Sequence, residues 1–196
     1  MPFAAAGQLA LRVEVEHAFD GKVSVELRTA TPSDTLAWER DWKPPLTQAG
    51  HPAALWPWAD HIERAEREEG RLCIALARGA RLEALASLVI EEANSRLEEG
   101  ATIIYVEYVG VAPDHLPPPL GRRAVKGLGG ILVAQAVRLS KEIGFQGRVG
   151  LHSKPEVEGF YSRLGFTSVA LEKTPDGKWL YFETTVEQAE AILAER

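Results

Sequence analysis

The chain has 196 residues, of which 45% are hydrophobic and 26% charged, and its formal net charge at pH 7 is −6. These values are typical of one ordinary globular domain, which we take as residues 1–196. The acidic balance argues against nucleic acid as the main partner, and no uninterrupted apolar run approaches the roughly 18 residues of a membrane helix.

The first part of the chain alternates apolar and polar residues. This pattern predicts two neighbouring strands at residues 11–17 and 22–28, with residues 1–20 forming an extra N-terminal strand region. A helix is expected next, with Ser33 or Asp34 as its N-cap. The start of the chain also lacks the basic segment of a secretory signal, so we expect a cytoplasmic protein without membrane attachment.

A proline- and tryptophan-rich segment at residues 43–58 shows no clear period, and both a loop over a pocket and a packed connection stay open. The side chains in question are Trp38, Trp42, Trp56 and Trp58. After it, periodicity and turn residues predict further elements in this order: a helix at 59–69, strands at 71–79, 81–92 and 101–113, a helix at 128–144, a strand at 147–153, a helix at 155–165, strands at 166–173 and 178–185, and a terminal helix at 186–196.

The stretch at residues 122–132 reads RRAVKGLGGIL and lies between a predicted strand and a predicted helix. A glycine-rich turn there presents unpaired amide hydrogens at a helix N-terminus, where they can hold phosphate oxygens. Glycines allow a pyrophosphate to approach the backbone, and basic side chains add charge-assisted bonds. The candidate anion-binding residues are Arg122, Arg123, Lys126, Gly127, Gly129 and Gly130. Close packing of helix and strand is the alternative reason for the glycines.

Two named phosphate motifs do not fit this turn. A P-loop requires Gly-Lys followed by Ser or Thr, whereas Lys126 precedes its glycine. A dinucleotide fingerprint requires a glycine three residues after Gly129, where Leu132 stands.

The turn is flanked by YVEYVGVAP before it and by VGLHSKPEVEGFYSRLGF after its helix. This combination, from about residue 23 to residue 184, resembles the GNAT superfamily of acyl-CoA-dependent N-acetyltransferases. The resemblance implies an α/β (α+β) fold with a central mixed, mostly antiparallel sheet flanked by helices. It also implies that the sheet is splayed between its fourth and fifth strands, with acetyl-CoA in the gap.

The same resemblance implies which residues contact the cofactor. The backbone near Val109 and Val111 pairs with the pantetheine arm, the glycine turn including Leu128 holds the pyrophosphate, and Ser153 joins the set next to Lys154. The family often has asparagine where Lys154 stands, and Arg or Gln where Ala124 stands, so Arg123 or Lys126 has to replace that side chain.

The implied reaction is direct attack of an uncharged primary amine of a small molecule on the acetyl thioester. Glu107 shares strand parity with Val109 and is the candidate base, while Tyr161 matches the family's general acid by position. His152, at the end of its strand, is a candidate proton relay or a structural histidine. An exposed carboxylate and a core aromatic remain the alternatives for Glu107 and Tyr161.

The sequence is also compatible with other functions. They include a non-catalytic acyl-CoA-binding or regulatory domain and acetylation of a protein amine. The histidines outside position 152 lack metal-ligand spacing, so no metal is expected, and Cys73 in an apolar run is expected to be buried. Strand edges and the terminal helix leave a homodimer possible.

Overall fold

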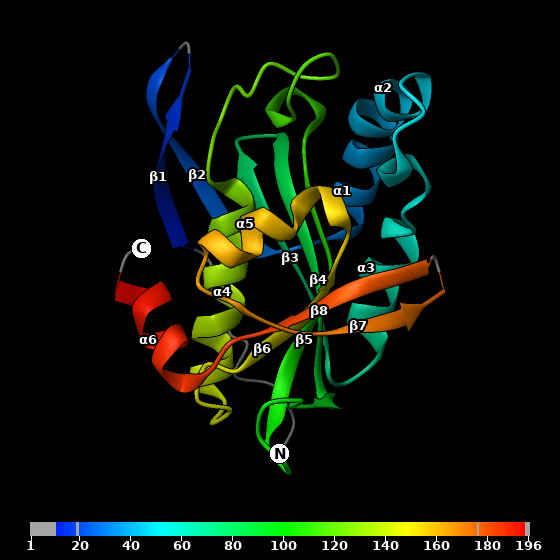
Figure 1. Ribbon diagram of the computed structural model, residues 1–196. Coiled ribbons are helices and arrows are strands. Elements are labelled where there is room, and N and C mark those ends of the chain that lie inside the picture. Colours follow the sequence, from blue (N-terminus) through cyan, green and yellow to red (C-terminus); the bar gives the residue numbers. More distant parts are fainter. Residues whose placement is uncertain (1–10, 19, 176, 195–196) are drawn as a thin grey trace. The chain divides into compact units, whose positions relative to one another are not determined.

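A computed structural model describes residues 11–18, 20–175 and 177–194 (Figure 1). The chain divides into two compact units, which we call the first unit (Met1–Ser87 with Tyr108–Leu132) and the second unit (Leu88–Glu107 with Val133–Arg196). Residues 1–10 of the predicted N-terminal strand region, and residues 195–196 of the predicted terminal helix, lie outside the described residues.

The described strands follow the order β1-β2-β3-β4-β5-β6-β8-β7. β4 (Arg81–Asn94) and β5 (Thr102–Val111) each contribute one part to the first unit and one part to the second. The parallel β5–β6 ladder pairs Ile104–Val106 with Val149–Leu151, and the other described ladders are antiparallel. The predicted mixed, mostly antiparallel sheet with flanking helices is therefore confirmed.

The first unit begins with a hairpin of β1 (Leu11–His17) and β2 (Gly21–Thr29), drawn in blue in Figure 1. Its register places Val13 opposite Val25, so the apolar residues of the alternating pattern share one face. β2 then pairs with β3 (Arg71–Arg78). The hairpin that the alternation predicts is present.

The helical part of the first unit contains α1 (Pro32–Ala37), the π-helical turn η1 (Trp38–Trp42), α2 (Lys43–Gln48), the 3-10 turn η2 (Pro52–Leu55) and α3 (Trp58–Arg67). The N-cap of α1 is Thr31, so the prediction of Ser33 or Asp34 is wrong. The carboxylate of Asp34 reaches back to the Thr31 amide at 2.8 Å and also binds Arg28, which is why the helix begins earlier.

Three of the four tryptophans of this region are core residues. Trp38, Trp42 and Trp58 are exposed by only 3%, 3% and 1%, and they cluster with residues of the surrounding helices and strands. A Cβ on Gly110 of β5 would lie 3.3 Å from the rings of Trp56 and Trp58. The segment at 43–58 is therefore a packed helical connection that seals one face of β5.

The second unit contains the other part of the sheet, with β6 (Val149–Ser153), β7 (Thr167–Thr174) and β8 (Gly177–Glu183). Its helices are α5 (Glu158–Arg163), preceded by the 3-10 turn η4 (Pro155–Val157), and α6 (Val186–Ala194). Thr185 and Gln188 cap α6 reciprocally, at 2.9 and 3.3 Å, as the sequence predicts. None of the described helices combines the length and apolar character that crossing a membrane requires.

Candidate functional site

The glycine turn leads into α4 (Leu128–Glu142), which starts where the sequence predicts. The first helical bond runs from the Ile131 amide to the Gly127 carbonyl at 3.0 Å. The amides of Leu128, Gly129 and Gly130 precede it, so they have no acceptor inside the helix. Gly127 is exposed and has a φ of 84°, in the left-handed region that favours glycine. These amides form the polar end of a helix that favours an anion.

The basic side chains of the turn lie in the same unit and are exposed. Arg122, Arg123 and Lys126 precede the helix, and Arg123 has a φ of 53°. Leu128 and Gly130 are buried and Gly129 is half-buried, so close packing at the helix start accompanies the exposed charges. The turn therefore packs tightly at the helix start, as one interpretation of the glycines predicts. It also places exposed basic side chains near the first amides of α4, as the other predicts.

The last residues of β5 form the second part of the site in the first unit. Tyr108 and Gly110 face the tryptophan cluster, with Trp56 and Tyr108 ring centres 5.3 Å apart. Strand alternation places the half-buried Val109 and Val111 on the opposite face. The described β5–β6 ladder ends at Val106, so backbone groups of β5 beyond it are outside that ladder.

A cavity of about 260 Å³ lies beside the tryptophan cluster, also in the first unit. Trp38, Trp56 and Trp58 contribute aromatic walls, and Glu39 and Lys43 at its rim form an ion pair at 2.8 Å. The tryptophans thus pack the helices together, and three of them also line a cavity.

His152 lies in the second unit, in a hydrogen-bonded network that the sequence does not predict. Its Nδ1 is 2.8 Å from the Tyr105 hydroxyl, and its Nε2 is 3.1 Å from a carboxylate oxygen of Glu172. Burial alone would raise the pKa of Glu172, but Arg96 and His152 outweigh it and lower that pKa. The network can order the imidazole and pass a proton along its length.

Tyr161 is 9% exposed and packs against Phe160, Phe166 and Phe182, with ring centres 5.0 to 6.0 Å apart. Burial, together with the nearby Tyr105, raises its pKa to about 12. The phenol therefore stays protonated near neutral pH and can act as a donor. The structure shows the core packing of the alternative interpretation. The raised pKa keeps the phenol protonated but makes it a weaker acid than a free tyrosine, so the acid role stays a prediction.

Glu107 and Ser153 complete the predicted residues of the second unit. Glu107 is half-buried on β5, two residues from Tyr105 and therefore on the same face of that strand. Ser153 is buried, and its hydroxyl donates to the Lys154 carbonyl at 3.0 Å. Within the described residues, no group of three or more His, Cys, Asp or Glu side chains is arranged to hold a metal ion.

Glu183, a second feature that the sequence does not predict, is fully buried in the second unit. Its carboxylate accepts hydrogen bonds from the Ser95 hydroxyl, from the Arg96 amide at 2.8 Å and from the Tyr181 hydroxyl at 3.0 Å. These donors satisfy a charge that would otherwise be costly to bury. The cluster ties the end of β4 to β8.

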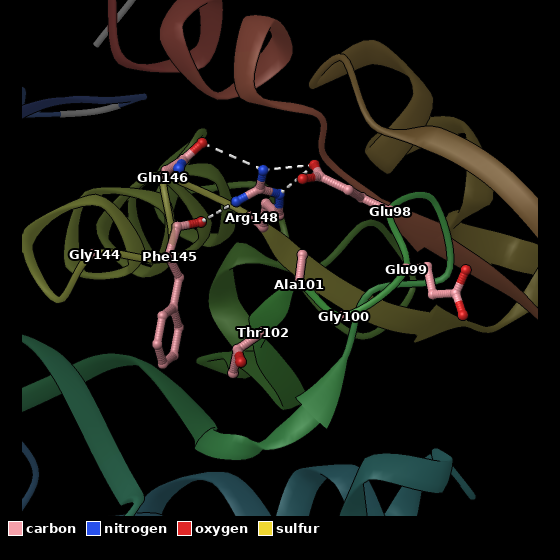
Figure 2. A pocket seen from close by; sticks show the side chains of 9 residues that line it. All are labelled: Glu98, Glu99, Gly100, Ala101, Thr102, Gly144, Phe145, Gln146 and Arg148. Atoms are coloured by element: carbon pink, nitrogen blue, oxygen red, sulfur yellow. Dashed lines mark hydrogen bonds and ion pairs between the residues drawn. The ribbon is translucent and has the colours of Figure 1, made fainter.

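An open cavity of about 350 Å³ lies elsewhere in the second unit (Figure 2). Arg148 donates there to Glu98, to the Phe145 carbonyl at 3.3 Å and to Gln146 at 3.3 Å. The guanidinium is thus engaged by protein acceptors that join the loops around residues 98 and 146. The residues around this cavity therefore hold two loops of the second unit together. The candidate features are the start of α4 with the end of β5 in the first unit and, separately, the His152 network in the second unit.

No protein-family model matches this sequence, and no curated protein matches it significantly. Solved structures do match. An acetyltransferase assigned to the GNAT family from Desulfovibrio desulfuricans is 16% identical, with a TM-score of 0.59 over 83% of this chain and 99% of that one. PaiA N-acetyltransferase from Thermoplasma acidophilum, solved with coenzyme A, is 15% identical, with a TM-score of 0.57 over 83% and 99%. An aminoglycoside acetyltransferase, solved with coenzyme A and kanamycin, is 19% identical, with a TM-score of 0.58 over 85% and 98%.

Proposed function

Because the chain has the fold of GNAT acetyltransferases, we propose that it transfers an acetyl group from acetyl-CoA to a primary amine of a small molecule. The observation that carries this proposal is the start of α4. There, the amides of Leu128, Gly129 and Gly130 lie ahead of the first helical bond, next to an exposed group of basic residues.

Acetyl-CoA supplies the activated acetyl thioester, and residues of this chain would hold its phosphates and its pantetheine arm. The amides at the start of α4 would hold the pyrophosphate, with charge-assisted bonds from Arg122, Arg123 and Lys126. The backbone of β5 at Val109 and Val111 would pair with the amides of the pantetheine arm. Ser153, in the second unit, is assigned to the cofactor as well. Two of the similar structures were solved with coenzyme A, which supports this assignment.

The reaction proceeds by direct attack. The amine nitrogen forms a bond to the thioester carbonyl carbon, the carbon–sulfur bond breaks, and the thiolate takes a proton. We assign Glu107 as the base that accepts the amine proton, directly or through water, and Tyr161 as the donor to the thiolate. Burial keeps the Tyr161 phenol protonated, so its proton is present when the thiolate forms.

His152 is assigned as a proton relay that works with Tyr105 and Glu172. Both ring nitrogens already have partners at 2.8 and 3.1 Å, so a proton that reaches the imidazole can move on to the carboxylate. The hydrogen bonds of His152 to Tyr105 and Glu172 are also compatible with a second candidate function, acyl-CoA binding without turnover. A domain that binds acyl-CoA without turnover would keep a structural His152 and a core Tyr161.

The tryptophan-lined cavity of the first unit is our candidate for the acceptor. Its aromatic walls suit an apolar group of a small amine. One similar enzyme, an aminoglycoside acetyltransferase, was solved with kanamycin, which supports testing small-molecule amines first.

The test measures release of free coenzyme A thiol from acetyl-CoA with a panel of primary amines, with acetylated product identified by mass spectrometry. We expect turnover with at least one small amine and about a hundredfold lower kcat in Glu107→Gln. Binding of acetyl-CoA without turnover, across amines and protein N-termini, would support the non-catalytic domain instead.

A further inference from the structure

Glu83 and His115 form a buried pair in the first unit, beneath the segment that leads into α4. Their side chains are 1% and 2% exposed, and the distance from His115 Nε2 to a Glu83 carboxylate oxygen is 2.6 Å. Arg78 and Arg81 also contact the carboxylate, at 3.1 and 3.2 Å. Burial by itself would raise the pKa of Glu83, but the His115 hydrogen bond and the Arg81 charge outweigh it and lower that pKa.

The second ring nitrogen of His115 fixes the tautomer. The backbone N–H of Val125 donates to Nδ1 at 3.1 Å, so Nδ1 must carry a lone pair. The ring proton therefore sits on Nε2 and points to Glu83. His115 is a neutral bridge between β4 and a backbone amide three residues before α4 begins.

The backbone of residues 114–125 is held by hydrogen bonds to Asp114, the residue before His115. The carbonyl of Asp114 accepts hydrogen bonds from the amides of Arg122 and Ala124, both at 3.1 Å, and its carboxylate contacts Arg81 at 2.8 Å. A Cβ on Gly121 would lie 2.1 Å from the Pro113 carbonyl oxygen, so the turn closes tightly only around glycine. The basic residues of the candidate anion site thus belong to a segment whose backbone is fixed by hydrogen bonds at Asp114 and Val125.

We propose that His115, buried and neutral, is a positioning residue for acyl-CoA, because its bond to Val125 sets where the basic turn and the first amides of α4 lie. This inference rests on the proposed function and concerns binding of the cofactor phosphates. Because His115 is buried, its role would be to hold the segment and not to contact the cofactor. Loss of the Val125 bond should therefore weaken cofactor binding and leave the acetyl transfer step intact.

Two variants separate the two bonds of the imidazole. His115→Asn places an amide oxygen near the position of Nδ1 and can still accept from Val125, whereas His115→Gln places an amide nitrogen near Nε2 and can still donate to Glu83. We expect His115→Gln to raise the Kd for coenzyme A and the KM for acetyl-CoA about tenfold, with kcat changed less than about twofold. His115→Asn should stay within about threefold of the wild type in Kd.

If His115 were purely structural, the variant with the lower melting temperature would also have the higher Kd for coenzyme A, whichever hydrogen bond it retains. Equal coenzyme A affinity in His115→Gln and the wild type would overturn the inference and leave the proposed function standing. If the wild type itself fails to bind coenzyme A, the proposed function fails and the positioning role fails with it.

One measurement needs no variant and no ligand. The imidazole nitrogen NMR spectrum of the wild-type protein should show His115 protonated at Nε2 and unprotonated at Nδ1, and amide hydrogen exchange should show protection at Val125. A proton on Nδ1, or rapid exchange at Val125, would contradict the bridge even if His115→Gln proves too unstable to purify.

Discussion

The hydroxyl oxygen of Tyr105 lies 2.8 Å from Nδ1 of His152, and Glu172 lies 3.1 Å from the other ring nitrogen. The imidazole is therefore held between a phenol and a carboxylate, which is an arrangement that can move a proton. Because the three residues come from β5, β6 and β7, the sheet itself sets their spacing.

We expect His152→Gln to lower kcat at least tenfold while the KM for acetyl-CoA stays within about twofold, because the amide cannot relay a proton. Tyr105→Phe removes one partner of the imidazole and should lower kcat in the same direction. A kcat unchanged in His152→Gln would reduce His152 to a structural residue.

Tyr161→Phe removes only the hydroxyl from a side chain that packs among phenylalanines. We expect kcat to fall about a hundredfold with an unchanged Kd for coenzyme A, because the donor to the thiolate is lost while the packing stays. Tyr181→Phe serves as the control, since Tyr181 is also buried in the second unit and its hydroxyl donates to Glu183. Equal kcat in Tyr161→Phe and the wild type would identify Tyr161 as a core aromatic.

Gly129→Leu places a large side chain at the half-buried first turn of α4. We expect the Kd for coenzyme A to rise at least tenfold, because the side chain blocks approach to the free amides. Glu142→Leu, exposed at the last turn of the same helix, should leave the Kd unchanged. Isothermal titration calorimetry measures both, and equal affinities would remove the anion site from α4.

Asp34 is 3% exposed and binds Arg28 through two hydrogen bonds, at 2.7 and 2.8 Å. Burial alone would raise the pKa of Asp34, but Arg28 and the Thr31 amide lower it overall. A lowered folded-state pKa stabilises the protein above the unfolded value of about 4, and this stability is lost as the pH falls through the folded-state pKa.

Asp34→Asn should therefore lower the free energy of unfolding by about 2 kcal/mol at pH 7, and the difference from the wild type should shrink as the pH drops below about 4. Urea unfolding at several pH values measures this. A difference that does not change with pH would show that the charge of Asp34 contributes nothing.

Local sequence patterns predict the elements of this fold well because each pattern acts over a few residues. Alternation identified the β1–β2 hairpin, and the Thr185–Gln188 pair identified the start of α6. The sequence pattern places the start of α1 too late, because the choice of Thr31 as N-cap depends on the Asp34 carboxylate, which accepts from the Thr31 amide and binds Arg28 at the same time.

The polar networks could not be predicted, because their members are far apart in sequence. Glu83 and His115 are separated by 32 residues, and Tyr105 and His152 by 47. Strand register brings Tyr105 and His152 together, and the 3-10 turn after β5 brings His115 to Glu83. Strand parity could have placed Tyr105 on the face of Glu107, but it carries no information on the facing residue of β6 or β7.

Binding of acetyl-CoA can be measured by a thermal melt. At about 100 times its Kd, a ligand stabilises a protein by about 2.7 kcal/mol, which corresponds to a rise of about 5 to 10 °C in Tm at this chain length. We predict this rise with acetyl-CoA and coenzyme A, and none with NAD. An unchanged Tm with saturating acetyl-CoA, in protein freed of copurified coenzyme A, would contradict the account.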